Sequence, residues 1–154
     1  MSTQSKISCV VFDVDGTLAH FDAERLGHLV HGQEKQWDAF HAAMATAEQI
    51  APVAHLLRRL KDAGETIVIC SGRPEGWSQH TVDWLEKNGL PFDAMYLRPH
   101  GWDAASDPDV KRELLSRMRK DGFEPWIVVD DRSSVVEAWR NEGLICLQCA
   151  KGDF

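Results

Sequence analysis

The stretch Ile7-Ser-Cys-Val-Val-Phe-Asp-Val-Asp-Gly-Thr17 decides the fold of this chain. Residues 7–12 are short, apolar and rich in β-branched side chains, which predicts a central strand covered on both faces. Asp13 and Asp15 follow at once, and side chains two positions apart in an extended segment point to the same side. Gly16 allows the chain to turn sharply after the pair. We therefore expect two carboxylates where this strand ends.

Strands alternate with helices along the rest of the chain. Apolar runs predict further strands at 66–70, 94–97, 126–129 and 144–149. Helical spacing, caps and stop signals predict helices over about 52–63, 78–88, 108–120 and 133–141, the last with Ser133 as its cap. Trp84 and Trp139 fall in two of these helices and are interpreted as core residues. The alternation is typical of βαβ units and predicts an α/β fold with a mostly parallel sheet.

The length and composition predict one domain. The chain has 154 residues and is 44% hydrophobic, which is enough for one core. Residues 20–48 are less regular and carry more acidic than basic side chains. We expect a single domain over 1–154, with short helices in a small insert at about 20–48.

The charge excludes some classes of partner. Lys and Arg number 17 against 24 Asp and Glu, so the formal net charge is −7. This acidity argues against binding DNA or an anionic membrane through broad charge, although brief contact with a nucleic-acid end remains compatible with it. No apolar run approaches the ~20 residues of a membrane span, and residues 1–6 lack the pattern of a secretory signal. We expect a cytoplasmic protein with no membrane partner.

The four cysteines are interpreted as thiols rather than as a metal or redox site. Cys9, Cys70 and Cys146 fall in apolar runs, where cysteine is usually a small core residue. Cys146 and Cys149 form a C-x-x-C pair, but a zinc site would need a second pair of ligands. A redox pair normally lies where a strand leads into a helix, whereas this one ends a strand.

Polar residues collect where the predicted strands end. The residues that follow the first, second and fourth strands are Asp13 and Asp15, Ser71-Gly72-Arg73, and Asp130-Asp131. Ligands of an open parallel sheet bind outside the carboxyl ends of its strands, so these side chains should converge. Four carboxylates together repel one another and need a cation, for which their hard oxygens favour Mg²⁺ over zinc. Lys111, in the helix after the third strand, can supply further positive charge.

The Ser71-Gly72-Arg73 stretch is typical of a phosphate cradle. A hydroxyl and successive N–H groups at a turn into a helix can hold phosphate oxygens. Taken alone, Ser-Gly before a proline is also an ordinary turn.

These residues, in order and at strand ends, resemble the four motifs of the haloacid dehalogenase (HAD) superfamily of phosphotransferases. A closer resemblance is to the 3′-phosphatase domain of phage-type polynucleotide kinase/phosphatase, and it covers most of the chain except the insert. The kinase half is missing, since no G-x-x-x-x-G-K-[ST] occurs. The matching blocks are 11–19, Ser71-Gly-Arg, Leu97-Arg-Pro, Asp107-x-x-x-Lys111, 129–140 and Gly152-Asp-Phe154.

The resemblance implies a Rossmann-like HAD fold with helices on both faces of the sheet and residues 20–48 as a small helical cap. It implies that Asp13 is the nucleophile that forms an aspartyl-phosphate, and that Asp15 is general acid and then general base. It also implies Mg²⁺ as cofactor, held by Asp13, the Asp15 backbone carbonyl and the Asp130/Asp131 pair. Which of Asp130 and Asp131 is the direct ligand is left open.

Further roles follow from the same resemblance. Ser71 and Lys111 would bind the non-bridging phosphate oxygens. Asp107, one helical turn before Lys111, would orient its ammonium, and Thr17 and Gly72 would contact the substrate. Substrate contacts are implied for three arginines that follow the motif blocks, with a surface salt bridge as the alternative for each: Arg73, Arg98 and Arg132.

For four further residues, the sequence supports a functional role only weakly. Arg25 matches only loosely an arginine of the family's insert and is expected to contact the substrate. Trp102 lies in a glycine-containing loop, where it could stack on a base or simply pack. His28 and His31 are three residues apart and are interpreted as surface residues rather than ligands.

Three functions remain open. The leading hypothesis is a Mg²⁺-dependent phosphomonoesterase that acts on 3′-phosphate ends of nucleotides or polynucleotides. The alternative is a phosphatase of small esters such as nucleoside 5′-monophosphates, which the acidity and the lack of a basic stripe favour. The third is a non-catalytic binding module, against which Asp13 and Asp15 argue. A separate kinase polypeptide is a possible partner, and the oligomeric state is left open.

Overall fold

Five parallel strands form one sheet at the centre of the molecule. The computed structural model describes residues 5–32 and 34–154. The strands are β1 (Ile7–Phe12), β2 (Thr66–Pro74), β3 (Ala94–Arg98), β4 (Phe123–Asp130) and β5 (Cys146–Gln148). They lie in the order β3-β2-β1-β4-β5, and each neighbouring pair is parallel. The parallel sheet predicted from the alternation of elements is thus confirmed.

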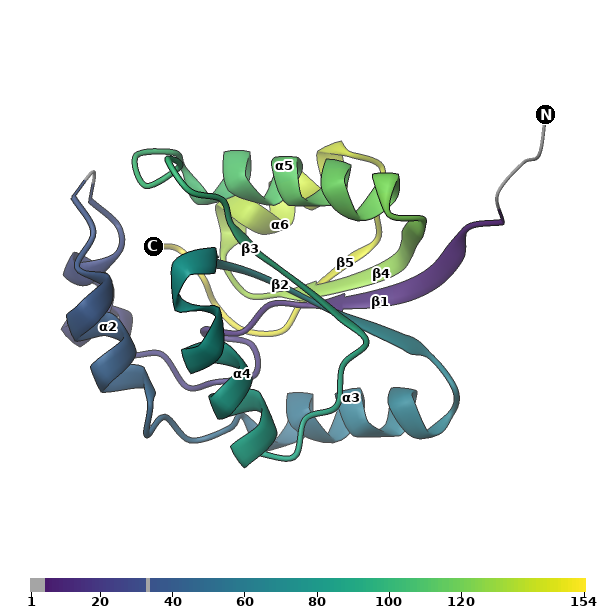
Figure 1. Ribbon diagram of the computed structural model, residues 1–154, viewed down its shortest axis with the longest axis horizontal. Helices are drawn as coiled ribbons and strands as arrows, with labels where there is room; N and C mark the ends of the chain where they lie inside the picture. The colour runs from purple at the N-terminus through teal and green to yellow at the C-terminus, as the bar shows by residue number, and fades with distance from the viewer. Residues whose placement is uncertain (1–4, 33) are drawn as a thin grey trace.

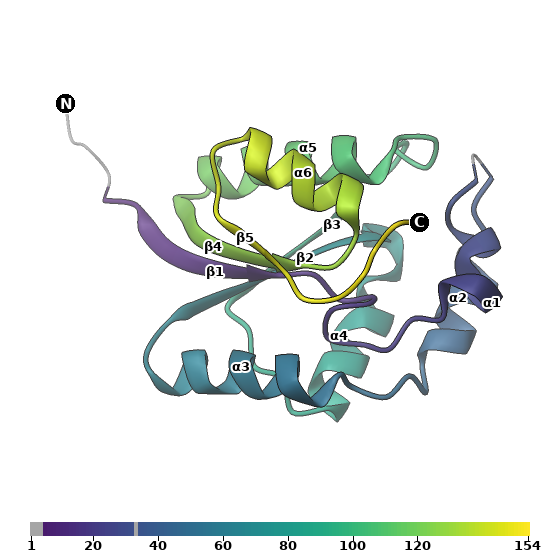
Figure 2. The same ribbon diagram turned by 180° about the vertical axis from the view of Figure 1, so that it is seen from behind.

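Helices cover both faces of this sheet (Figures 1 and 2). The helices on one face are α3 (Ala51–Asp62) and α4 (Ser78–Lys87), with the short 3-10 helix η2 (Glu75–Trp77) before α4. Those on the other face are α5 (Asp107–Lys120) and α6 (Ser133–Asn141). Within the described residues, no helix is both long and apolar enough to cross a bilayer.

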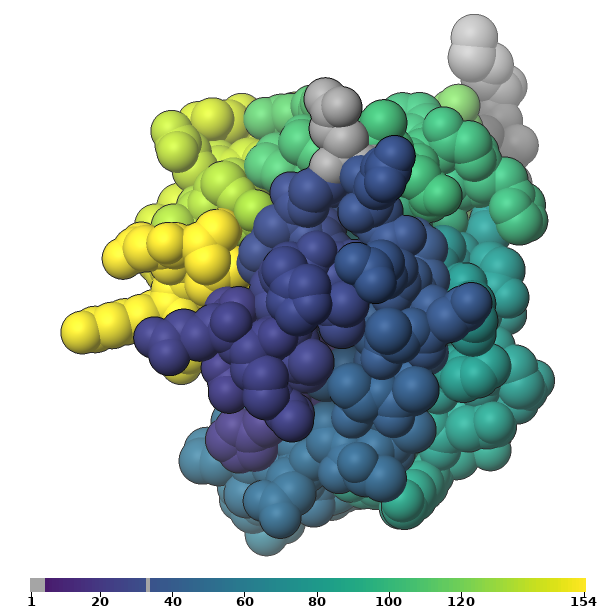
Figure 3. All heavy atoms as spheres, turned by 90° about the vertical axis from the view of Figure 1, so that its left-hand side faces the viewer, coloured from purple at the N-terminus to yellow at the C-terminus, as the bar shows by residue number. Residues whose placement is uncertain are grey.

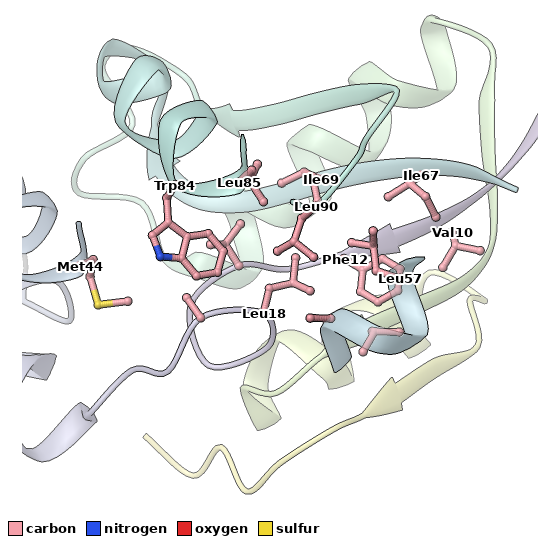
Figure 4. Packing of buried hydrophobic residues seen from close by; sticks show 14 of the residues in the cluster. Val10, Phe12, Leu18, Met44, Leu57, Ile67, Ile69, Trp84, Leu85 and Leu90 are labelled. Atoms are coloured by element: carbon pink, nitrogen blue, oxygen red, sulfur yellow. The ribbon is translucent and has the colours of Figure 1, made fainter. Parts of the chain in front are cut away.

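The two-residue period of the strands divides the core into two layers. Val10 and Phe12 of β1 pack toward α3 and α4, in the layer that Figure 4 shows with Leu57 and Trp84. The intervening Val11 packs toward α5 and α6. All four β1 residues from Cys9 to Phe12 are fully buried, as expected for a strand covered on both faces. Trp84 and Trp139 are core residues, as predicted.

The segment 20–48, called the cap from here on, lies beyond the carboxyl ends of the strands. It contains α1 (Ala23–Leu26), the 3-10 helix η1 (Gly27–Leu29) and α2 (Trp37–Met44). Figure 3 looks onto this end of the molecule, where the blue cap covers the centre of the face and the yellow C-terminal residues lie beside it. The cap therefore stands over the edge of the sheet at which the polar motifs end.

Several predicted boundaries were wrong. β2 continues through Ser71-Gly-Arg to Pro74, which pairs with Arg98, so this stretch is strand rather than turn. β4 begins earlier than predicted, at Phe123, because the register shift between Cys9 and Val10 accommodates Pro125. β5 is shorter than predicted and lies at the edge of the sheet, beside β4.

Two helix starts also differ from the prediction. α5 begins at Asp107, and its cap is the Ser106 side chain, which accepts a hydrogen bond from the Asp109 N–H. The N-cap of α6 is Arg132, whose side chain makes no capping hydrogen bond. Ser133 is the first helical residue instead, and its hydroxyl donates to Asp153.

Candidate active site

The strand register aligns the polar motifs at the same end of the sheet. Phe12, the last residue of β1, pairs with Ile69 of β2 on one side and with Val129 of β4 on the other. Asp13 and Asp130 follow two of these paired residues, so they leave the sheet side by side. Two motifs more than a hundred positions apart in sequence thus meet at the centre of the sheet edge.

Three carboxylates form a compact buried cluster here. One oxygen from each of Asp13, Asp130 and Asp131 lies within 4.8 Å of the other two. All three residues are buried, with Asp13 the most accessible at 8% exposed. An all-oxygen, all-anionic donor set at this spacing suits a hard divalent cation such as Mg²⁺. The Asp15 side chain, which was expected to transfer protons rather than to bind the metal, points to Arg73.

The loop after β1 packs against this cluster. Gly16 has φ +85°, and a Cβ at this position would lie 2.1 Å from Asp131 Oδ2, so no larger residue fits. The Thr17 hydroxyl donates to Asp13 Oδ2 at 3.1 Å and lies 3.4 Å from Asp131 Oδ1. Thr17 is fully buried, so it orients carboxylates rather than forming part of the described pocket wall.

Lys111 supplies the positive charge at the base of the cluster. Its Nζ donates to Asp13 Oδ1 at 3.1 Å, to Asp130 Oδ2 at 3.0 Å and to the Cys70 carbonyl at 2.9 Å. The Trp139 indole N–H also donates to Asp130 Oδ2, at 3.1 Å. Lys111 is therefore oriented by Asp13 and Asp130, and the expectation that Asp107 orients its ammonium was wrong.

Burial and charge shift the pKa values of the cluster. Burial and the neighbouring Asp130 raise the pKa of Asp13 well above its usual range, although Lys111 opposes the rise. Burial and Asp130 likewise raise the pKa of Asp131 to about 6. For Lys111, burial lowers the pKa, but Asp13 and Asp130 outweigh it and the net shift is well upward. A divalent cation beside these oxygens would favour their ionised forms.

Asp15 and Arg73 form a two-pronged ion pair above the cluster. Arg73 Nε donates to Asp15 Oδ2 at 2.9 Å, and Nη2 donates to Oδ1 at 2.6 Å. Arg73 is 2% exposed, and its Nη1 donates to the buried Thr81 hydroxyl at 3.3 Å. The pair fixes the direction in which the Asp15 carboxyl faces the pocket.

Ser71 and Gly72 lie on the same wall as Arg73. Ser71 is buried beside the pocket, and its hydroxyl accepts a hydrogen bond from the Arg73 N–H at 3.1 Å. Gly72 also lines the pocket, and a Cβ there would lie 3.2 Å from Asp107 Oδ1. Extended backbone, rather than the expected turn, presents these two residues.

Asp107 joins two arginines. Its Oδ1 accepts from Arg98 Nη2 at 2.6 Å, and its Oδ2 accepts from Arg132 Nη1. Arg98 is fully buried, and its other donors reach backbone carbonyls. The structure therefore places Arg98 behind the wall, where it supports Asp107, and leaves Arg132 at the pocket.

Ring side chains from the cap and the C-terminus form part of the pocket lining. The cavity volume is about 70 Å³, with the acidic cluster, Lys111 and Ser71 among its lining residues. Cap and C-terminal residues complete its wall: Phe21, Val30, His31, Trp37, Phe40 and Phe154. His31 stacks on Phe154 at 5.3 Å between ring centroids. The pocket thus combines these ring side chains with the charged residues of the cluster.

Of three residues with weaker expectations that do not line the pocket, only Arg25 was expected to contact the substrate. Arg25 is exposed and borders a separate hollow with His20 and Asp22. Trp102 is half-buried against the core beside α5. His28 is exposed.

The cysteines are free thiols. Cys9, Cys70 and Cys146 are buried, as predicted, whereas Cys149 is exposed. Burial raises the pKa of Cys146 to about 12, so this thiol is protonated at neutral pH. Cys149 Sγ lies 3.8 Å from the Thr17 hydroxyl, next to the acidic loop.

The motifs at the strand ends did not predict every residue of the site. Thr81 lies inside α4, and Phe40 lies inside α2, so neither follows a strand. Phe154 belongs to the terminal Gly-Asp-Phe block, which was the one available signal that this segment reaches the site.

The family model of the polynucleotide kinase PNKP phosphatase domain matches residues 7–154. The chain belongs to this family. It is accordingly a HAD-fold phosphatase, a phosphoric monoester hydrolase.

Solved structures agree with this assignment. The chain is similar to a chain of a Pnkp1/Rnl/Hen1 complex, with 27% identity and a TM-score of 0.80, over 99% of this chain and 49% of that one. A second structure, titled the Pnkp1/Rnl/Hen1 RNA repair complex, gives 26% identity and a TM-score of 0.78 over 100% of this chain and 47% of that one. This PNKP-family chain thus spans about half the length of those relatives.

A more distant likeness shows the fold alone. The class C acid phosphatase from Bacillus anthracis is 19% identical with a TM-score of 0.61, over 97% of this chain and 70% of that one.

Proposed function

We propose that this chain is a Mg²⁺-dependent phosphatase of 3′-phosphate ends of nucleotides or polynucleotides that works through an aspartyl-phosphate. The observation that carries the proposal is the buried cluster of Asp13, Asp130 and Asp131 with Lys111 bonded to two of its members. Its family adds support for the nucleic-acid substrate. Mg²⁺, held by these three carboxylates, would supply positive charge to the phosphate oxygens.

The residues suit a two-step displacement. An oxygen of Asp13 bonds to phosphorus while the bond from phosphorus to the ester oxygen breaks. That ester oxygen takes a proton from the neutral form of Asp15, which leaves Asp15 as the carboxylate that pairs with Arg73. A water then attacks phosphorus, its proton passes to Asp15, and the bond to Asp13 breaks to release phosphate. Lys111 and Ser71 stabilise the charge on the non-bridging oxygens. Arg73 keeps the Asp15 carboxyl directed at the bond that breaks.

The second candidate is a phosphatase of small esters such as nucleoside 5′-monophosphates. The net charge of −7 and the small volume of the pocket favour it. A long nucleic-acid ligand would normally meet a basic groove. The first candidate therefore requires that the enzyme bind only the end of the nucleic-acid strand.

A substrate panel tests the proposal. The chain is incubated with Mg²⁺ and a 3′-phosphorylated oligonucleotide, a nucleoside 3′-monophosphate or a nucleoside 5′-monophosphate, and released phosphate is measured. We expect the highest kcat/KM with the 3′ esters and no turnover in EDTA. Equal or better turnover of the 5′ ester would transfer the assignment to the second candidate.

A kinase partner is a further proposal. Relatives in the Pnkp1 structures have chains about twice as long as this one. A polynucleotide kinase that works with this phosphatase, on a separate polypeptide or in the same chain, would lie outside these 154 residues.

A further inference from the structure

The Arg73 guanidinium is held on several sides. Asp15 accepts hydrogen bonds from Arg73 Nε and Nη2, and the Thr81 hydroxyl accepts one from Arg73 Nη1. The central carbon of the guanidinium lies over the Phe40 ring, 5.3 Å from the ring centroid. A guanidinium can bind a carboxylate in its plane and an aromatic ring on its face at the same time. The Phe40 ring thus limits rotation of the group that holds Asp15.

Phe40 is itself fixed within the cap. It is 2% exposed, and edge-to-face contacts link its ring to Phe21, Trp37 and His41 at 5.2–6.0 Å between centroids. The next residue of α2, His41, stacks on Trp77 at 4.8 Å with an interplanar angle of 6°. Trp77 lies just after β2. The cap is therefore attached to the body of the domain beside Arg73.

We propose that Phe40 is a positioning residue, whose ring keeps the Arg73 guanidinium in the orientation that directs Asp15. The inference rests on the proposed function, in which Asp15 transfers the proton. A proton donor must lie within hydrogen-bond reach of the leaving oxygen, and a small displacement of it costs much rate. Through Phe40, the cap would act on the chemical step as well as shaping the mouth of the pocket.

This role predicts a dependence on the leaving group. An alkoxide needs the proton from Asp15 as it departs, whereas a nitrophenolate departs readily without one. The ratio kcat/KM covers the steps up to departure of the leaving group, so it excludes the later hydrolysis of the aspartyl-phosphate. If the Asp15 carboxyl is misoriented, kcat/KM should therefore fall mainly for esters with poor leaving groups.

The experiment compares benzyl phosphate with p-nitrophenyl phosphate. Both present one aromatic ring to the pocket, so direct contact of Phe40 with the substrate would affect both alike. In Phe40→Leu, we expect kcat/KM for benzyl phosphate to fall about tenfold more than kcat/KM for p-nitrophenyl phosphate. The control is Leu26→Ala, which removes another buried apolar side chain of the cap and should change both values by the same factor.

A second variant covers the case in which Phe40→Leu does not fold. Thr81→Val keeps the shape of the side chain and removes its hydrogen bond to Arg73. It should show the same selectivity for the leaving group. Equal losses on both esters, in whichever of these variants folds, would overturn the role of Phe40 and leave the proposed function intact. A parent protein inert toward both esters and a 3′-phosphorylated oligonucleotide would overturn both proposals.

Discussion

Lys111 Nζ lies 3.1 Å from Asp13 Oδ1, in a place where both side chains are almost wholly buried. The same ammonium lies 3.0 Å from Asp130 Oδ2, so one cation serves two anions. A cation shared in this way partly offsets the repulsion between buried carboxylates, and its loss leaves them uncompensated.

Replacing Lys111 tests this balance. We expect Lys111→Met to lower the free energy of unfolding in EDTA by about 2–4 kcal/mol, because three buried carboxylates lose their counter-charge. Urea denaturation measures the change. Arg112→Met removes an exposed partner of Asp109 on the same helix and should cost less than about 1 kcal/mol. A Lys111→Met protein as stable as the Arg112→Met protein would contradict this account.

A divalent ion should stabilise the folded chain. At a Mg²⁺ concentration about tenfold above its dissociation constant, we expect the melting temperature to rise by about 3–5 °C. The physical reason is relief of repulsion among Asp13, Asp130 and Asp131. Thermal melts with Mg²⁺ and with NaCl at equal ionic strength separate this effect from screening. No rise, or an equal rise in Asp131→Asn, would argue against a site at this cluster.

Asp13→Asn should fold and lose turnover. We expect kcat to drop by at least about a thousandfold, because the amide cannot form the bond to phosphorus. Circular dichroism checks the fold, and phosphate release measures turnover. Asp109→Asn, an exposed change on α5, is the matched control and should retain parental activity. Asp13→Asn activity within about tenfold of the parent would remove Asp13 from the role of nucleophile.

His41 should make stability depend on pH. Burial lowers the pKa of His41 to about 4, and within the described residues its Nε2 has no hydrogen-bond partner. Between pH 6.5 and 4 the unfolded chain therefore binds a proton at this site that the folded chain does not, so acidification favours unfolding. The folded state loses about 1–2 kcal/mol from this residue between about pH 7 and 5.

The variant His41→Phe keeps a ring against Trp77 and removes the titrating group. Its free energy of unfolding should fall less than that of the parent between pH 7 and 5, as denaturant titrations at the two pH values would reveal. Parallel curves for the two proteins would show that folding does not lower the pKa of His41.

Gly152 should not tolerate a side chain. A Cβ at this position would lie 2.0 Å from the Asp131 carbonyl oxygen and 2.6 Å from Arg132 Cα. We expect Gly152→Ala to cost about 1–3 kcal/mol of stability and to reduce turnover, because both neighbouring residues belong to the site. Gly76→Ala is the control, since its Cβ would meet only the His100 ring at 3.5 Å. Equal stability and activity of the two variants would show that the C-terminal segment moves aside freely.

Local patterns explain why much of the fold could be predicted. The apolar run of 7–12 must be buried on both faces, and a run of that kind alternating with helices is satisfied by a parallel sheet. The polar residues that end such strands meet at one edge, so the gathering of Asp13 and Asp130 followed from chain order alone. Strand ends were less predictable, because the length of β2 and β5 depends on which neighbour each strand finds.

The α/β architecture and the acidic, lysine-containing edge could be predicted from the chain, because both depend on residue type and order. The contacts of each polar side chain could not, because they depend on how the elements pack together. Arg98 and Asp107 are residue types expected at a substrate site. In the structure, however, Arg98 is buried behind Asp107, and Asp107 binds Arg98 through one oxygen and Arg132 through the other. Partners of this kind come from elements distant in sequence, and packing selects them. The same holds for Phe40 and Arg73, which meet only because the cap closes onto the end of the sheet.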